Sequence, residues 1–263
     1  MPDSRDSAPL DSVADLLATA TMVGVFTGAG MSAESGIPTF REAQTGLWEQ
    51  FDPQQLATPT AFRADKALVW GWYRWRMALV ERAQPNAGHL AIAALERMKP
   101  GLVVVTQNVD DLHERAGSSD VVHLHGSLFA PRCFACGRAF AGAASMPAAG
   151  PETPRVEPPA CRHCGGPVRP GVVWFGESLP VEAWSRAERL MEDCDVLLVV
   201  GTSGVVQPAA GLPRLAKRYR KQIVEINPQT SELTLLADVV CKAKAADALP
   251  AILATMQKLR DDV

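Results

Sequence analysis

Residues 28–41 read GAGMSAESGIPTFR and follow directly on the apolar run TMVGVFT at 21–27. An apolar run that ends in closely spaced glycines is typical of a buried strand whose turn brings bare backbone against the phosphates of a nucleotide. Gly28, Gly30 and Ala33 match the G-x-G-x-x-A spacing of dinucleotide-binding folds. The match alone is a weak signal, because small residues follow strands in many unrelated proteins. The stretch predicts an α/β fold with a dinucleotide at the end of its first strand.

The chain beyond this turn departs from the pattern of a hydride-transferring dehydrogenase. Such an enzyme continues into a regular helix and a second strand, which ends about 20 residues on in an acid for the adenosine ribose. Here Gly36, Pro38 and Gly46 interrupt any helix, and Phe40 and Arg41 fall in the resulting loop. A long loop over a dinucleotide indicates a lid that takes part in the chemistry.

Apolar runs and helical patterns alternate along most of the chain. The runs are unbroken rather than alternating, as in strands buried on both faces, and lie at 21–27, 102–106, 121–124, 195–200, 222–226 and 238–241. Helical patterns lie at 11–19, 86–99, 181–193, 208–220 and 246–259. This alternation predicts a doubly wound, parallel, Rossmann-like sheet with helices on both faces.

Two segments interrupt the alternation, and we expect them to form a smaller lobe. Residues 47–85 are predicted to be its helical module and residues 129–177 its zinc-binding module. The Rossmann-like domain then consists of residues 1–46, 86–128 and 178–263.

Polar residues and glycines follow the predicted strands where parallel strands end at a common edge. Ligands of open α/β sheets bind beyond that edge, so we expect these residues to converge on one crevice. They are Gly28 to Ser32, then Gln107, Asn108 and Asp110, then His125, then Gly201, Thr202 and Ser203, and finally Asn227.

Composition excludes several classes of protein. The 263 residues carry a net charge of −3 with no dense basic tract, which argues against a nucleic-acid platform. No apolar run reaches the roughly 18 residues of a membrane span, and the start MPDSRDSAPL is polar rather than signal-like. We therefore expect a soluble, cytoplasmic protein without a membrane partner, a monomer being favoured. Cys194 and Cys241 lie in or beside apolar segments and are expected to be buried thiols.

The other four cysteines form two C-x-x-C pairs, Cys133 with Cys136 and Cys161 with Cys164. Four thiolates around one ion give a closed tetrahedral zinc site with no position open for water. Such a zinc is structural and would hold together a lobe with little apolar content. Redox-active or unpaired cysteines are the alternative.

Taken together, these motifs resemble the sirtuins, the NAD-dependent protein-lysine deacylases. The resemblance covers nearly the whole chain, and Met31, where the family more often has isoleucine, is a change of apolar shape only. Its motifs are GAGMSAESGIPTFR at 28–41, TQNVDDLHE at 106–114, LHGS at 124–127, the cysteine quartet, RPGVVWFGE at 169–177, GTSGVVQP at 201–208, INP at 226–228 and ALPAIL at 248–253.

The resemblance implies that NAD is consumed as a co-substrate. His125 would be the catalytic base that activates a ribose hydroxyl, and the products would be free lysine, nicotinamide and 2′-O-acyl-ADP-ribose. The pyrophosphate and the nicotinamide ribose would contact Ala29, Gly30, Ser32, Phe40 and Arg41. The nicotinamide would contact Gln107, Asn108 and Asp110. The adenosine would contact Ser203, Asn227 and Ala245. The acylated peptide would add as a strand between two segments, the run from Val172 to Glu177 and the segment from Gly204 to Pro208. In the first of these segments, its contacts would be Val173, Trp174, Phe175 and Gly176.

A second resemblance concerns the acyl group. Tyr73 and Arg76 lie three apart on a predicted helix, hence on one face. They resemble the Tyr-x-x-Arg pair of the sirtuin subclass that accepts succinyl- and malonyl-lysine, and Ala57 would leave room for the longer chain. An arginine fork and a tyrosine hydroxyl suit a carboxylate. We expect desuccinylase and demalonylase activity, with weaker deacetylation. The alternative for this helix is an amphipathic surface helix.

Other functions remain open at this point. The enzyme could act mainly on acetyl groups, or transfer a single ADP-ribose to protein from the same activated NAD. A dehydrogenase would need a ribose acid that the chain does not offer at the expected place. A non-enzymatic zinc adaptor would leave the polar strand ends without a purpose.

Overall fold

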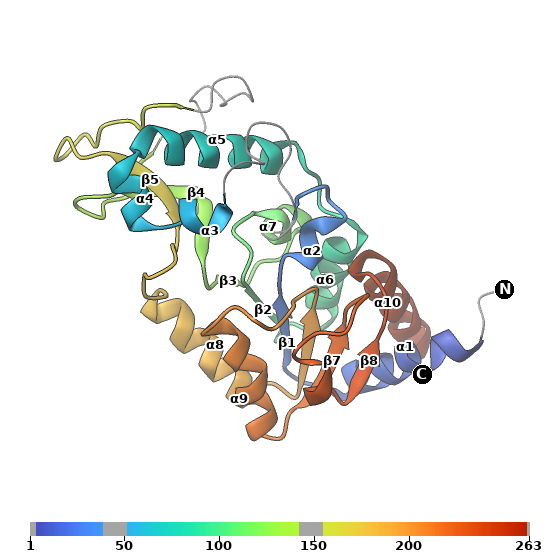
Figure 1. The fold of residues 1–263 in the computed structure, drawn as a ribbon. Coiled ribbons are helices and arrows are strands. Elements are labelled where there is room, and N and C mark those ends of the chain that lie inside the picture. Colours follow the sequence, from blue (N-terminus) through green and yellow to red (C-terminus); the bar gives the residue numbers. More distant parts are fainter. Residues whose placement is uncertain (1–3, 39–51, 142–154, 262–263) are drawn as a thin grey trace.

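A computed structural model of the protein describes residues 4–38, 52–141 and 155–261. Its centre is a six-stranded sheet in the order β3-β2-β1-β6-β7-β8, in which every neighbouring pair is parallel (Figure 1). The strands are β1 (Val23–Thr27), β2 (Val103–Thr106), β3 (Val121–His123), β6 (Val196–Val200), β7 (Gln222–Ile226) and β8 (Val239–Cys241). Each strand coincides with a predicted apolar run, so the predicted doubly wound sheet is confirmed.

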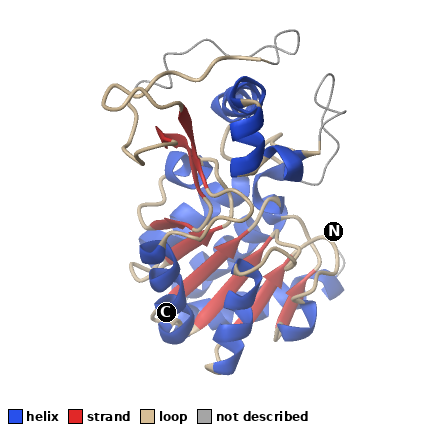
Figure 2. Ribbon diagram, turned by 60° about the vertical axis from the view of Figure 1, so that its left-hand side comes forward, coloured by secondary structure: helices blue, strands red, loops and turns tan. Residues whose placement is uncertain are grey.

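Helices cover both faces of the sheet (Figure 2). On one face α1 (Ser4–Thr19), α6 (Ala87–Met98) and α10 (Ala245–Asp261) bury residues such as Leu17, Ile92 and Ile252 against Val25. On the other, α8 (Val181–Asp193) and α9 (Leu212–Arg218) bury Leu190 and Leu212 against Phe26. Val25 and Phe26 are neighbours on β1, so both faces of this strand are buried, as unbroken apolar runs predict.

The order of the sheet reverses beside β1. The chain moves outward from β1 through β2 to β3, then returns to place β6 on the other side of β1. The loops after β1 and β6 therefore run in opposite directions, which opens a crevice at the carboxyl ends of these strands.

A smaller lobe stands over this edge of the sheet. It contains α3 (Pro53–Leu56), α4 (Pro59–Ala64), α5 (Lys66–Arg82) and the antiparallel pair β4 (Gly126–Cys133) and β5 (Val168–Val172). Side chains cap both longer helices: Thr58 accepts from the Ala61 N–H at the start of α4, and Asp65 accepts from the Leu68 N–H at the start of α5. The lobe has its own aromatic core, in which Phe62, Trp72 and Trp174 are fully buried.

Some helix boundaries differ from those predicted. Helix α1 begins at Ser4 rather than at residue 11. The sequence at 4–10 has no apolar periodicity from which this first part of the helix could be predicted. The pattern at 208–220 is divided into η3 (Ala209–Gly211) and α9. Short elements complete the fold: α2 (Gly30–Ala33), α7 (Leu112–Ala116) and η4 (Thr234–Leu236). Among the described residues, no helix has the length and apolar character needed to cross a bilayer.

Candidate active site

A cavity of about 610 Å³ lies at the carboxyl ends of the central strands, between the sheet and the smaller lobe. Its size is that of a pocket for a small organic ligand. The predicted nucleotide residues that line it are Gly28, Ala29, Gly30, Ser32, Gln107, Asn108, Asp110, His125, Gly201, Thr202, Ser203 and Asn227. The predicted substrate residues that line it are Ala57, Tyr73, Arg76, Val173, Trp174, Phe175 and Gly176.

Of the predicted nucleotide residues that the structure describes, Ala245 is not part of this lining. Ala245 begins α10 and packs by its backbone against Gly88, so its contact with adenine stays a prediction. Phe40 and Arg41 lie outside the described residues.

The glycines after β1 are required by packing between two loops. A Cβ at Gly28 would lie 2.7 Å from the Thr202 Cβ, and a Cβ at Gly30 would lie 2.8 Å from the Gly201 carbonyl oxygen. The Gly30 N–H donates to that carbonyl at 2.8 Å. The glycine spacing thus lets the loops after β1 and β6 touch at the point where the sheet order reverses. It also leaves a floor of bare backbone, which suits a phosphate chain.

A buried set of hydrogen bonds lies in the cavity wall, between the loop that follows β2 and the turn that follows β1. The Asn108 side-chain amide donates to the Gly28 carbonyl and to Ser32 Oγ, both at 3.1 Å, and Ser32 Oγ donates to Asp110 Oδ2 at 3.0 Å. Burial raises the pKa of Asp110, and hydrogen bonds from Leu112 and Ser32 oppose that shift. These partners hold amide and carboxyl groups at fixed positions on the cavity wall.

A second set of bonds links the loops after β2, β6 and β7. The Gln107 side chain donates to Thr202 Oγ1 at 2.9 Å, and the Asn227 side chain donates to the Thr202 carbonyl at 3.0 Å. Three of the five converging loops are therefore tied together through Thr202.

His125 lies between β3 and β4, half-buried at the cavity. Its Nδ1 lies 2.9 Å from the Gln107 carbonyl oxygen. A carbonyl can only accept, so Nδ1 carries the hydrogen and, in the neutral ring, Nε2 carries the free lone pair. Burial lowers the pKa of His125, and the bond to Gln107 opposes this only in part. The ring is thus a neutral proton acceptor near physiological pH.

Two other histidines, His89 and His113, are buried behind the cavity wall. The rings of His89 and His113 meet edge to face with centroids 4.9 Å apart. His113 Nε2 lies 3.2 Å from Thr27 Oγ1, which in turn donates to Thr106 Oγ1. His89 Nδ1 accepts from the Asn86 N–H and closes the capping box of α6. Burial lowers the pKa of His89 to about 4 and that of His113 well below its usual value.

We expect His89 to make the fold sensitive to acid. A histidine whose pKa is lower in the folded protein than in the unfolded chain contributes its full stabilisation when the solution pH is above the unfolded pKa. This stabilisation is lost as the pH falls from about 6.5 towards the pKa of the folded state. With the folded value near 4, the loss between pH 7 and pH 5 is about 2 kcal/mol of unfolding free energy. His89→Gln retains a capping acceptor without the titration, so its urea midpoint should change less between these pH values. The exposed His163→Gln variant is the control. An unchanged pH dependence in His89→Gln contradicts this account.

The opposite end of the cavity is formed by α5. Tyr73 is buried, and its hydroxyl accepts from the Trp174 indole N–H at 2.9 Å. Arg76, one helical turn later, places its guanidinium 5.0 Å from the centroid of the Trp72 ring. The two side chains share one face of α5 and one cavity, as their spacing predicts.

Sequence reasoning missed an ion pair beside these residues. Arg169 is buried and donates to both oxygens of Glu177, across the apolar run VVWF. The sequence signal for this ion pair is the presence of two opposite charges, one on each side of the apolar run. Glu114, an exposed residue of α7, lies 2.6 Å from His123 Nε2 and helps to raise the pKa of that histidine.

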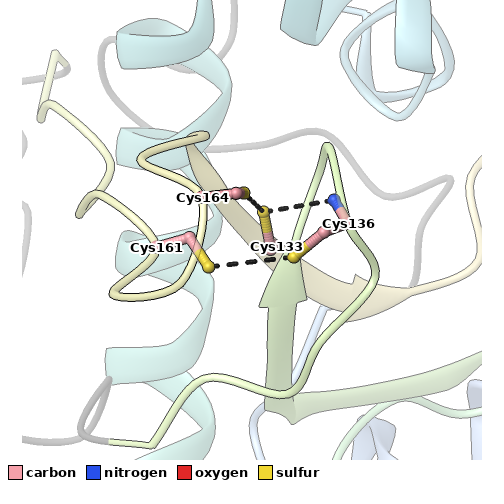
Figure 3. A group of neighbouring side chains, drawn as sticks. All are labelled: Cys133, Cys136, Cys161 and Cys164. Atoms are coloured by element: carbon pink, nitrogen blue, oxygen red, sulfur yellow. Dashed lines mark hydrogen bonds between the residues drawn. The ribbon is translucent and has the colours of Figure 1, made fainter.

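The four predicted zinc ligands lie together near the end of β4 and the start of β5 (Figure 3). Their sulfur atoms lie within 4.8 Å of one another, with 3.5 Å between Cys133 and Cys164 and 3.9 Å between Cys136 and Cys161. A tetrahedron with zinc–sulfur bonds of about 2.3 Å has edges of roughly 3.8 Å, so this donor set fits one zinc ion. Each C-x-x-C pair is followed by a glycine with positive φ, at Gly137 and Gly165.

We expect one zinc per chain, and Cys161→Ser should lose most of it. The ion contributes stability because a preformed site does not exist in the unfolded chain. The variant should therefore also melt at a lower temperature than the parent. Metal content per chain and the melting curve check this, with Cys194→Ala as the control because Cys194 is buried in the sheet core, away from the cluster. Full zinc content in Cys161→Ser would refute the assignment.

The model of the Sir2 family matches residues 28–208. A protein of Methylococcus capsulatus named NAD-dependent protein deacylase is 50% identical over 254 residues, which cover 95% of this chain and 98% of that protein. A crystal structure of a Sir2 homologue with NAD has a TM-score of 0.86 at 45% identity, covering 95% of this chain and 94% of that one. A structure of Sir2Af2 bound to a myristoylated histone peptide has a TM-score of 0.77 at 31% identity, covering 97% and 99%.

Proposed function

Because this chain belongs to the Sir2 family, the sirtuins, we propose that it removes succinyl and malonyl groups from protein lysines and acetyl groups more weakly. The coarser activity, NAD-dependent protein deacylation, is that of its relatives at about 50% identity. The acyl preference rests on one observation: Tyr73 and Arg76 line the same cavity as His125.

The charge at the acyl end of the cavity favours a carboxylate. Burial lowers the pKa of Arg76, while Tyr73 and Asp110 oppose the shift. An arginine starts so far above neutrality that the side chain remains a cation there. Burial also raises the pKa of Tyr73 to about 12, so its hydroxyl keeps its proton and can donate. A relative holds a myristoylated peptide, but an arginine and a hydroxyl suit a short acyl chain with an anionic end better than a long apolar one.

His125 is the proton acceptor that we assign to the reaction. The Gln107 carbonyl fixes the tautomer, so Nε2 is the basic atom. NAD, when bound, supplies a ribose carbon that receives the acyl oxygen and a ribose hydroxyl that carries the acyl group away. The role of the histidine is to remove the proton from that hydroxyl.

The nucleotide end of the cavity offers groups that match NAD. Asn108 and Asp110 present an amide and a carboxyl group that are both held by hydrogen bonds to Ser32 Oγ, which suits the nicotinamide carboxamide. Ser203 and Asn227 line the same cavity from the loops after β6 and β7, where we place the adenosine ribose. Phe40 and Arg41 keep the roles predicted from the family resemblance.

The peptide is proposed to add as a strand beside Val173 to Gly176. Apolar side chains are exposed on both sides of this position, Phe175 on one segment and Val205 and Val206 on the other. Backbone pairing tolerates many sequences, so the enzyme would read the acyl group more than the peptide.

The cytoplasm is the compartment that we propose, since all six cysteines are free of disulfides and a reducing environment maintains thiols. The monomeric state stays a prediction.

Product analysis tests this function against its nearest rival. Purified protein is incubated with NAD and a succinyl-lysine peptide, and peptide and nucleotide are identified by mass spectrometry. We expect free lysine, nicotinamide and succinylated ADP-ribose, with no reaction when NAD is omitted. ADP-ribose attached to the protein or peptide, with the succinyl group intact, would show a mono-ADP-ribosyltransferase instead.

A further inference from the structure

The indole ring of Trp174 belongs to the buried core of the smaller lobe and is 1% exposed. Phe62 and Phe134 pack against it at ring-centroid distances of 5.3 and 6.2 Å. The Arg169 guanidinium lies 3.4 Å from the ring centroid. The only polar atom of the indole, Nε1, donates to the Tyr73 hydroxyl at 2.9 Å. Aromatic rings and a cation therefore fix the plane of the indole, and its edge points at the tyrosine of the acyl end.

The ion pair between Arg169 and Glu177 holds this arrangement in place. The guanidinium donates to both Glu177 oxygens and also to the Val172 carbonyl at 2.8 Å. Glu177 Oε2 accepts in addition from the Trp174 backbone N–H at 2.8 Å. One carboxylate thus fixes the cation under the indole and the backbone that carries it. A bidentate pair of this kind is directional, which a single ion contact is not.

The hydrogen bond from Trp174 has a consequence for the direction of the Tyr73 proton. An indole N–H can only donate, so the tyrosine oxygen accepts in this bond. The hydroxyl hydrogen must then point away from the indole. Tyr73 lines the cavity together with Arg76, and there a bound carboxylate offers the acceptor that this hydrogen needs.

We propose that Trp174 is a positioning residue for acyl recognition: its indole N–H directs the Tyr73 hydroxyl hydrogen towards the acyl carboxylate, and the Arg169–Glu177 pair holds the indole. This inference rests on the proposed function, in which Tyr73 and Arg76 hold the carboxylate of succinyl- or malonyl-lysine. An acetyl group has no acceptor at that position, so the effect of Trp174 on the Tyr73 hydroxyl concerns only the longer, anionic groups.

The test is a double-mutant cycle with Trp174→Phe, Tyr73→Phe and the double variant. The ratio of kcat/KM for succinyl- and acetyl-lysine peptides of one sequence is the readout, because any general disturbance of the lobe affects both substrates. Trp174→Phe removes the N–H and keeps an aromatic ring, and it should lower the ratio about three- to tenfold. In the Tyr73→Phe background the same change should leave the ratio unaltered, because the hydroxyl that it orients is gone. The Kd of each peptide, measured by calorimetry without NAD, should follow the same pattern.

The possible outcomes separate this inference from the proposed function. A parent enzyme that prefers the succinyl peptide, with a Trp174→Phe variant that keeps the full preference, overturns the inference alone. Equal effects of Trp174→Phe in both backgrounds also overturn it, since the indole then acts by packing. A parent enzyme without succinyl preference overturns both. Arg169→Lys retains the charge without the planar fork and gives the same test if Trp174→Phe does not fold.

Discussion

Replacing His125 with alanine is expected to lower kcat/KM for deacylation by about 10²- to 10⁴-fold, the usual contribution of a positioned general base. The ring is held by one bond to the Gln107 carbonyl and lines the cavity. No other described histidine lines that cavity. His123→Gln is the matched control, because His123 lies two residues earlier and bonds instead to Glu114. If His125→Ala retains activity close to that of the parent enzyme, the histidine is not the base.

The pH profile of the parent enzyme gives a second measure of the same residue. Burial lowers the pKa of His125. The active, neutral form therefore persists below about pH 6.5, the ordinary midpoint for histidine. We expect the acidic limb of kcat/KM to have its midpoint below that value. A midpoint above it would mean that another group controls the limb or that the ring is held as a cation.

Replacing Arg76 with methionine is expected to lower the preference for succinyl- over acetyl-lysine by about 10- to 150-fold, which corresponds to the roughly 1.5–3 kcal/mol of a charge-assisted hydrogen bond. Methionine retains most of the apolar length of the arginine side chain, so it should largely preserve the packing against the Trp72 ring while it removes the charge. The measurement is kcat/KM on peptides that differ only in the acyl group.

Arg76→Lys serves as the matched variant. It keeps the positive charge but loses the planar fork, so it should retain part of the succinyl preference. Equal losses for succinyl and acetyl substrates in Arg76→Met would remove the specificity claim and leave a general deacylase.

The sheet and the zinc site were predictable because their signals are local. Unbroken runs such as LVVVT at 102–106 have few stable alternatives to a strand buried on both faces. The spacing of the cysteine pairs likewise leaves tetrahedral coordination as the simplest solution. The convergence of Gln107, His125 and Asn227 on one cavity followed from the rule that parallel strands end at a common edge.

Interactions between distant segments were not predictable from local pattern. Trp174 and Tyr73 are 101 residues apart, and nothing in either segment indicates that the indole donates to the hydroxyl. The glycine spacing indicates that Gly28 and Gly30 are needed, but the immediate cause, the close approach of Gly201 and Thr202, is visible only in the packed fold. Such contacts depend on how the smaller lobe and the loops pack, which sequence periodicity does not encode.

A competition assay among acyl groups measures the proposed preference for anionic acyl chains. Equal concentrations of succinyl-, malonyl- and acetyl-lysine peptides of one sequence are mixed with enzyme and NAD, and their initial rates are followed by mass spectrometry. We expect the succinyl and malonyl peptides to be consumed at least about tenfold faster than the acetyl peptide, with one nicotinamide released per acyl group. Consumption of the acetyl peptide at an equal or higher rate would contradict the proposed preference.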